Sequence, residues 1–156
     1  MGSCILKNFR IRDLALRFNY DSPSIFRSEV RAIDRDEPLS AEEREFLLAL
    51  DFAYAKTFDE EPGLTIQDSD IDSLAKGLYA LSYFYARNSE DKIAYMVSRL
   101  GVDLIAPKCS AENSINLRML HMMTSFEMGF AKETLSLFHQ LIGQERFVPG
   151  AKKFEY

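Results

Sequence analysis

Tryptophan is absent from this sequence of 156 residues, and cysteine occurs only twice, as Cys4 and Cys109. Two cysteines cannot form the disulfide framework of a small secreted domain, so both are expected to be free, reduced thiols. No apolar run approaches the ~18 residues of a membrane-spanning helix, so no membrane span is expected. Glycine-rich phosphate loops, nucleophile elbows and paired-carboxylate motifs are also missing. The sequence therefore predicts neither catalysis nor a bound cofactor.

The charge of the chain is acidic and unevenly placed. The formal net charge is -5. Ten acidic residues lie between Ala41 and Asp72, against only two basic ones, Arg44 and Lys56. An acidic protein repels phosphate backbones at long range, so nucleic acid is not the expected partner.

The distribution of apolar residues indicates an all-α protein. Apolar residues make up 47% of the sequence and charged residues 28%, as in ordinary globular domains. No stretch alternates polar and apolar residues for long enough to form a strand. We expect about seven helices in one domain over residues 1–156. Its predicted parts are an N-terminal apolar and basic segment (1–20), N-terminal helices (21–58), two hairpin repeats (70–107 and 110–149) and a tail (150–156).

The first 20 residues fit three interpretations. Gly2 and Cys4 match a myristoylation and palmitoylation signal, which together would supply the two anchors that stable membrane attachment requires. Lys7, Arg10 and Arg12, with no acid among the first twelve residues, match a mitochondrial-type targeting segment. The apolar residues between them also fit a first packed helix. The sequence leaves all three open.

Two helix starts are marked by capping residues before residue 58. Pro23 follows Ser22, and a proline at the first helical position loses no intrahelical hydrogen bond. Ser40 and Glu43 form a capping box, in which each side chain accepts a free backbone N–H of the first turn. The helix after Ser40 is apolar on most sides, so we place it centrally. The polar residues 59–70 that follow predict a flexible connection.

Residues 71–149 contain an internal repeat. With a shift of 41 positions, apolar residues of its first half fall on apolar residues of its second half. The matched pairs are Leu74 with Ile115, Leu78 with Met119, Leu81 with Met122, Tyr85 with Phe126, Ala94 with Leu135, Val97 with Phe138 and Leu100 with Leu141. Units that repeat every ~20–50 residues bury their apolar faces against their neighbours. We therefore predict a right-handed α-superhelix of stacked antiparallel helix hairpins.

Polar residues and glycines divide the two hairpins. Asp70 and Ser89 are expected to cap the helices that follow them. Gly101 is expected to end a helix in the left-handed conformation, and Gly129 to turn the chain in the second hairpin.

Neither histidine has the sequence context of a metal ligand. His121 and His139 lie on different helices of one hairpin, without a cysteine or carboxylate at helical ligand spacing. We interpret both as hydrogen-bonded or exposed side chains and predict no metal site.

Four methionines lie in the first helix of the second hairpin or directly after it. They are Met119, Met122, Met123 and Met128. Their spacing fits a helical core, and one or two of them facing outward would form a protein-docking patch.

The second hairpin follows the residue pattern of a known repeat family. Gly129 stands between its two helices, residues 132–141 carry a Leu-x-Leu-Phe run in the second helix, and Pro149 closes the unit. This pattern resembles a pentatricopeptide (PPR) repeat. In the first hairpin Asn88 stands for the glycine and Pro107 for the closing proline.

The resemblance implies a fold and two kinds of function. PPR repeats are stacked helical hairpins, and where the family reads RNA it uses a polar side chain early in each first helix. The corresponding residues here are Leu78 and either Arg118 or Met119, and an apolar side chain cannot hydrogen-bond a base edge. Short PPR-like proteins are subunits of mitochondrial assemblies such as the trypanosome-type ATP synthase and ribosomes. The resemblance thus implies a mitochondrial location, with the cytoplasm as the alternative.

We therefore predict a non-catalytic helical-repeat adaptor or scaffold that docks on a protein partner within a larger complex. Stacked hairpins create a concave surface, and this array lacks polar capping units at its ends. Tyr79, Tyr83 and Phe84 are the predicted partner-binding residues, because interfaces are rich in aromatic residues. Core packing is the alternative for all three. The alternatives for the whole protein are an RNA-binding PPR protein and a membrane-attached effector or signalling protein acylated at Gly2.

Overall fold

The prediction of an all-α protein is confirmed. A computed structural model describes the backbone of residues 8–147 and the side chains of residues 8–143, and this part of the chain contains seven α-helices and no strand. The helices are α2 (Phe9–Leu16), α3 (Pro23–Asp36), α4 (Ala41–Phe58), α5 (Ile71–Arg87), α6 (Asp91–Leu100), α7 (Ala111–Glu127) and α8 (Ala131–Phe147). A 3₁₀ turn, η1 (Asp68–Asp70), precedes α5, and a π-helical segment, η2 (Gly101–Ile105), follows α6. The right-handed superhelix stays a prediction.

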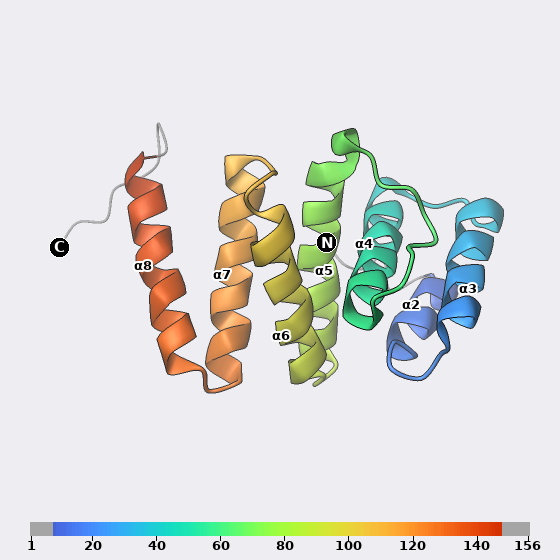
Figure 1. Cartoon of the computed structure of the whole chain (residues 1–156), viewed down its shortest axis with the longest axis horizontal. Coiled ribbons are helices and arrows are strands. Elements are labelled where there is room, and N and C mark those ends of the chain that lie inside the picture. Colours follow the sequence, from blue (N-terminus) through green and yellow to red (C-terminus); the bar gives the residue numbers. More distant parts are fainter. Residues whose placement is uncertain (1–7, 148–156) are drawn as a thin grey trace. The chain divides into compact units, whose positions relative to one another are not determined.

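The chain divides into two compact units. Unit 1 is Met1–Ala80 and unit 2 is Leu81–Tyr156, so the boundary falls inside α5. In Figure 1 the helices of unit 1 run from blue to green and those of unit 2 from green to red. Each unit has its own buried core.

Unit 1 is organised around α4, in agreement with its apolar sequence. The predicted capping box is present, because Ser40 Oγ accepts the Glu43 N–H at 3.2 Å and the Glu43 carboxylate accepts the Ser40 N–H at 2.9 Å. Helices α2 and α3 pack against α4. The ring of Tyr54 in α4 stacks on Phe26 of α3, with their centroids 3.8 Å apart. Burial of these two rings stabilises the centre of the unit.

A first packed helix, one of the three interpretations of the N-terminal segment, is present as α2. Its N-cap is Asn8, whose side chain accepts the Ile11 N–H at 3.1 Å. Ile11 and Leu14 are fully buried. Gly2 and Cys4 lie outside the described residues, as do Pro149 and the predicted tail 150–156. Lipidation and targeting therefore stay predictions.

The acidic connection after α4 is tied down at its middle. Asp51 of α4 is buried, and its carboxylate accepts the N–H groups of Gly63 and Leu64 at 2.7 and 2.9 Å. The Gly63 carbonyl accepts a hydrogen bond from Arg31 of α3 at 3.1 Å. The loop expected to be flexible is thus held to two helices. Asp51 thus provides hydrogen-bond partners for two backbone N–H groups that lie outside any helix.

Helices α4 and α5 cross very closely at Gly77. A Cβ atom on Gly77 would lie 2.0 Å from the Glu45 carbonyl oxygen and 2.9 Å from the Ala49 Cβ. Protein interiors are close-packed, so no side chain fits between the two helix backbones at this point.

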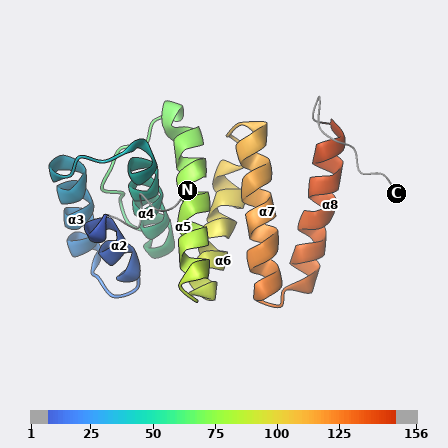
Figure 2. The same cartoon turned by 180° about the vertical axis from the view of Figure 1, so that it is seen from behind.

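The two hairpins repeat with an offset of 40 residues, not 41. Helices α5 and α7 begin 40 residues apart, and so do α6 and α8. Burial follows the same offset, since Leu81 and His121, its equivalent, are both buried, as are Val97 and Leu137. Within unit 2, α7 and α8 form an antiparallel pair that lies side by side in both views (Figures 1 and 2).

The apolar alignment was one residue out of register because the second hairpin buries polar residues and exposes apolar ones. Its buried polar side chains are Ser114, His121, Thr124 and Ser125. Its large exposed apolar side chains include four that the alignment had matched to apolar residues of the first hairpin, namely Met119, Phe126, Leu135 and Phe138. An alignment that maximises apolar matches therefore pairs residues that are not equivalent in the structure.

The turn of the first hairpin is made by Ser89, not by Asn88. Ser89 has φ 60° and its equivalent Gly129 has φ 79°, so both are left-handed. Since Ser89 is itself the turn residue, it does not cap α6, whose N-cap is the next residue. Asp70 is the last residue of η1, whose N-cap is Gln67, and its carboxylate accepts the Gln67 N–H at 3.0 Å.

Gly101 does not end its helix in the left-handed conformation. Its φ is -60°, and the chain continues into η2, where the Ala106 N–H bonds to the Gly101 carbonyl at 2.8 Å. A Cβ on Gly101 would lie 3.0 Å from Leu117 Cδ2 of α7. The close approach of α7, and not a turn, is what favours glycine here.

Candidate functional site

Two of the three predicted partner-binding aromatics lie on the surface. Tyr79 and Tyr83, one turn apart on α5, are exposed, whereas Phe84 is only 6% exposed. The Phe84 ring packs edge-on against Tyr85, with centroids 5.5 Å apart. Phe84 is therefore a core residue, which corrects its prediction as an interface residue. The Arg87 guanidinium lies 5.8 Å from the Tyr83 ring, and partner binding by the two tyrosines stays a prediction.

A row of large apolar side chains lies exposed along α7. It consists of Met119, Met123 and Phe126, which we call the α7 row. Their spacing of four and then three residues places them on one helix face. Met123 is 58% exposed and Phe126 is 69% exposed. By the 40-residue offset, Met119 and Met123 are the equivalents of Tyr79 and Tyr83, so the first helix of each hairpin carries apolar groups at the same surface positions.

A buried polar network joins three helices of unit 2. His121 of α7 has Nδ1 2.7 Å from Ser98 Oγ of α6 and Nε2 2.6 Å from Glu133 Oε2 of α8. Tyr95 of α6 donates its hydroxyl proton to Glu133 Oε1 at 2.6 Å. Ser98 Oγ also lies 2.8 Å from Thr124 Oγ1. Sequence patterns gave no sign of this network, because its members come from three helices.

The network has the components of a serine–histidine–acid triad but not its accessibility. Ser98 is completely buried, and its hydroxyl donates to the Tyr95 carbonyl at 2.9 Å. A nucleophile has to reach a substrate atom, and no substrate can reach this one. The network therefore acts to hold α6, α7 and α8 together. His121 is a hydrogen-bonded histidine and His139 an exposed one, so both fit their predicted roles.

Burial and hydrogen bonds together set the protonation of the network. Burial lowers the pKa of the His121 imidazole below its ordinary value of 6.5, although the hydrogen bond that the imidazole donates to the Glu133 carboxylate opposes the change. For Glu133, burial acts to raise the pKa of the carboxyl group, but hydrogen bonds from Tyr95 and His121 outweigh it and lower that pKa. At neutral pH the network thus holds a neutral imidazole against a carboxylate.

Acid is expected to destabilise unit 2 in two stages. His121 has a folded pKa below its unfolded value of about 6.5, so its contribution is complete above that pH and is lost as the pH falls below it. Glu133 has a folded pKa below its unfolded value of about 4.5, so its contribution is lost only below that lower pH. Denaturant midpoints measured from pH 7.5 downward would show both stages.

Two variants separate the first stage from general acid effects. His139→Gln should keep the loss of stability below pH 6.5, the ordinary histidine pKa, whereas His121→Gln should remove it. A wild-type midpoint that does not move as the pH falls through that range would contradict the assignment to His121.

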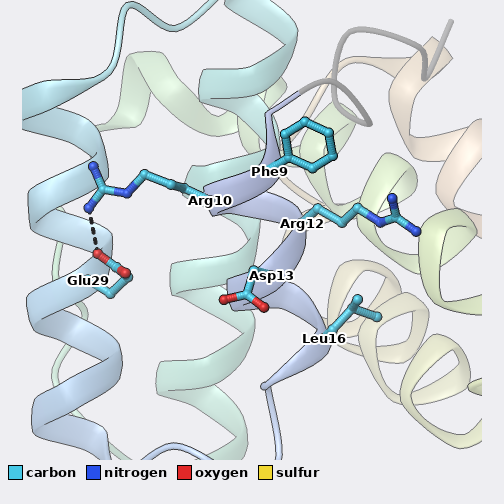
Figure 3. A pocket seen from close by; sticks show the side chains of 6 residues that line it. All are labelled: Phe9, Arg10, Arg12, Asp13, Leu16 and Glu29. Carbon is cyan, nitrogen blue, oxygen red and sulfur yellow. Dashed lines mark hydrogen bonds and ion pairs between the residues drawn. The ribbon is translucent and has the colours of Figure 1, made fainter.

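A shallow hollow on α2 is the other surface feature of interest (Figure 3). It is lined by Phe9, Arg10, Arg12, Asp13 and Leu16 of α2 and by Glu29 of α3. Arg10 donates to Glu29 at 2.7 Å, so their charges neutralise each other. In Figure 3 the Arg12 side chain points away from Arg10. A ligand pocket needs polar groups that converge, and these do not.

The described residues add two findings on metals and membranes. Across the side chains of residues 8–143, no three His, Cys, Asp or Glu residues come close enough together to hold a metal ion. None of the helices in the described part of the chain combines the length and apolar character needed to cross a membrane. Cys109 is half-buried, and its thiol lies 3.8 Å from the Ala106 carbonyl oxygen, to which it donates.

Comparison with known proteins gives no match among family models, curated proteins or solved structures. The resemblance to PPR repeats therefore rests on residues of the two hairpins alone. Any function has to be argued from the chemistry of this chain's own surface.

Proposed function

We propose that this chain is a non-catalytic helical-repeat adaptor that docks on a protein partner through the α7 row. The observation that carries the proposal is the row itself, three large apolar side chains on one exposed helix face. Contiguous exposed apolar surface is a common mark of a protein-interaction site. Methionine and aromatic residues are also enriched where proteins meet.

The buried network supports this role because it fixes the helix that carries the row. His121 ties α7 to Ser98 of α6 on one side and to Glu133 of α8 on the other. A surface held in one conformation loses little entropy when a partner binds. The buried polar network thus holds α7 in place, and the apolar side chains of the α7 row remain exposed for a partner.

The PPR resemblance supports a place within a larger assembly, which we propose to be mitochondrial, with the cytoplasm as the alternative. The other function implied by the resemblance is RNA binding. The net charge of -5 works against that function, because phosphate binding depends on lysine and arginine.

Co-purification from the protein's native cells tests the proposal. Tagged wild-type chain is compared with Phe126→Glu and with Ile25→Glu, a control at an exposed apolar residue of α3 in unit 1. A stoichiometric protein partner should be retained by wild type and by Ile25→Glu. Because interface anchors are worth more than about 1 kcal/mol each, its recovery should fall about fivefold or more with Phe126→Glu.

Circular dichroism should show equal helix content in all three proteins. Equal recovery of the partner with all three would contradict docking through the α7 row. Loss of the partner on nuclease treatment would instead favour the RNA-binding alternative.

A further inference from the structure

The outer side of α6 forms the interface between the first and the second hairpin. Tyr95, Ser98 and Gly101 lie along that side, and each contacts the second hairpin. Tyr95 bonds to Glu133 of α8, Ser98 lies against His121 of α7, and a Cβ added to Gly101 would lie 3.0 Å from Leu117 Cδ2 of α7. This side of a second helix is therefore where the next helix of the array packs.

The 40-residue offset places Leu135, Phe138 and Leu141 of α8 at the corresponding positions. Leu135 is 58% exposed, Phe138 is 45% exposed, and Leu141 is half-exposed. We call these three residues the α8 face. No helix of the described residues covers it as α7 covers α6. In repeat arrays a side without a neighbouring repeat is normally polar, and the α8 face is not.

The residues of the α8 face define the chemistry of whatever packs on it. A leucine and a phenylalanine replace the tyrosine and the serine of α6, so the polar contacts of the internal interface have no counterpart. Lys132 and His139 are exposed on α8 at three and four residues' distance from Leu135. The nearby acid, Glu133, is already bonded to Tyr95 and His121. No ion pair joins Lys132 to any other side chain of residues 8–143, so it is available to a carboxylate.

We propose that the α8 face binds an amphipathic helix of the partner protein, packed on α8 as α7 packs on α6. The apolar stripe of that helix covers Leu135 and Phe138, and its acidic residues lie opposite Lys132. The inference rests on the proposed function, because it names the chemistry of the partner that an adaptor would carry. The partner helix would pack on α8 in the way that α7 packs on α6 within this chain, with apolar contacts in place of polar ones.

A second copy of this chain fits the α8 face less well. Its α7 is already packed against its own α6, and it would bring His121 against Phe138 with no serine to accept or donate a hydrogen bond. Its α2 does expose Phe9 and Leu16, but Arg12 lies between them. That arginine would meet Lys132, and like charges oppose association.

Site-specific photo-crosslinking in the native cells tests the proposal. Benzoylphenylalanine is introduced at position 135, and at position 25 of unit 1 as a control for an equally exposed apolar residue. We expect position 135 to crosslink to a segment of another protein with apolar residues at helical spacing and Asp or Glu beside them. Position 25 should crosslink to background level.

A synthetic peptide of the crosslinked segment then measures the contribution of each residue by fluorescence anisotropy. Phe138→Asp should weaken its binding about tenfold or more, as expected for a central apolar anchor. Lys132→Glu should weaken it about fivefold, with a smaller effect at high salt. Ile25→Asp should leave binding unchanged.

Several outcomes would overturn the inference. Crosslinks to this chain's own sequence would mean that the chain itself, and not a partner protein, covers the face. Crosslinks to a basic or non-helical segment would mean that the partner has a different chemistry. Background crosslinking at position 135 would mean that the face is unoccupied. A partner that is lost with Phe126→Glu but never crosslinks at 135 would leave the proposed function standing and remove only this inference.

Discussion

Replacing Gly77 with alanine is expected to destabilise the protein by about 3 kcal/mol or more, at or beyond the upper end for an overpacked core. The added Cβ would sit 2.0 Å from the Glu45 carbonyl oxygen, which belongs to a helix backbone and cannot rotate away. Relief therefore requires α4 and α5 to separate, and separation would open the packing around Ala49. Guanidinium denaturation followed by circular dichroism measures the loss in the free energy of unfolding.

Two other glycines provide matched controls for Gly77→Ala. Gly143 lies inside α8 with no atom within 4 Å of its Cβ position, so Gly143→Ala should stabilise the protein by up to about 1 kcal/mol. Gly101→Ala should fall between the two, because its nearest neighbour is the movable end of the Leu117 side chain. A Gly77→Ala protein as stable as wild type would show that α4 and α5 are not packed as described.

Replacing His121 with alanine is expected to destabilise the protein by about 3 kcal/mol. The substitution removes a buried ring and leaves a cavity between α6 and α7. It also leaves the Tyr95 hydroxyl as the one hydrogen-bond partner of the Glu133 carboxylate among the side chains of residues 8–143, and it deprives Ser98 Oγ of its shortest contact. The loss at Ser98 adds most to the cost, because this hydroxyl is fully buried, whereas the Glu133 carboxylate is partly exposed.

The second histidine is the control for this prediction. His139 is exposed on α8, so His139→Ala should change the free energy of unfolding by less than about 0.5 kcal/mol. Hydrogen exchange would locate the effect of His121→Ala, with protection lost in α6 and α7 and retained in α4. Equal stability of the two alanine variants would contradict a central role for the network.

The sequence was a good guide wherever one local signal decided the structure. The capping box of Ser40 and Glu43 is formed as predicted, and Pro23 begins α3. The apolar character of α4 on most sides correctly placed it in the centre of unit 1. In each case the residues that carry the signal lie within one helix or its cap.

The sequence was a poor guide where the outcome depends on partners far along the chain. Among the adjacent aromatics Tyr83, Phe84 and Tyr85, only the first is exposed, and nothing local determines which one that is. The polar interior of the second hairpin depends on bonds from His121 to Ser98 and Glu133, which lie on other helices. Matching apolar residues therefore treated Met119, Phe126, Leu135 and Phe138 as core residues, although all four are exposed.

The π-helical segment η2 sets the rotation of everything that follows it. Its carbonyl at Gly101 is bonded to the N–H five residues on, at Ala106, where an α-helix would use the fourth. Removing one residue there, such as Val102, would let the ordinary turn close and would rotate the chain beyond it by about 100° around the helix axis. His121 would then no longer arrive opposite Ser98. The one extra residue in this π-helical turn thus sets the rotation at which the second hairpin packs against α6.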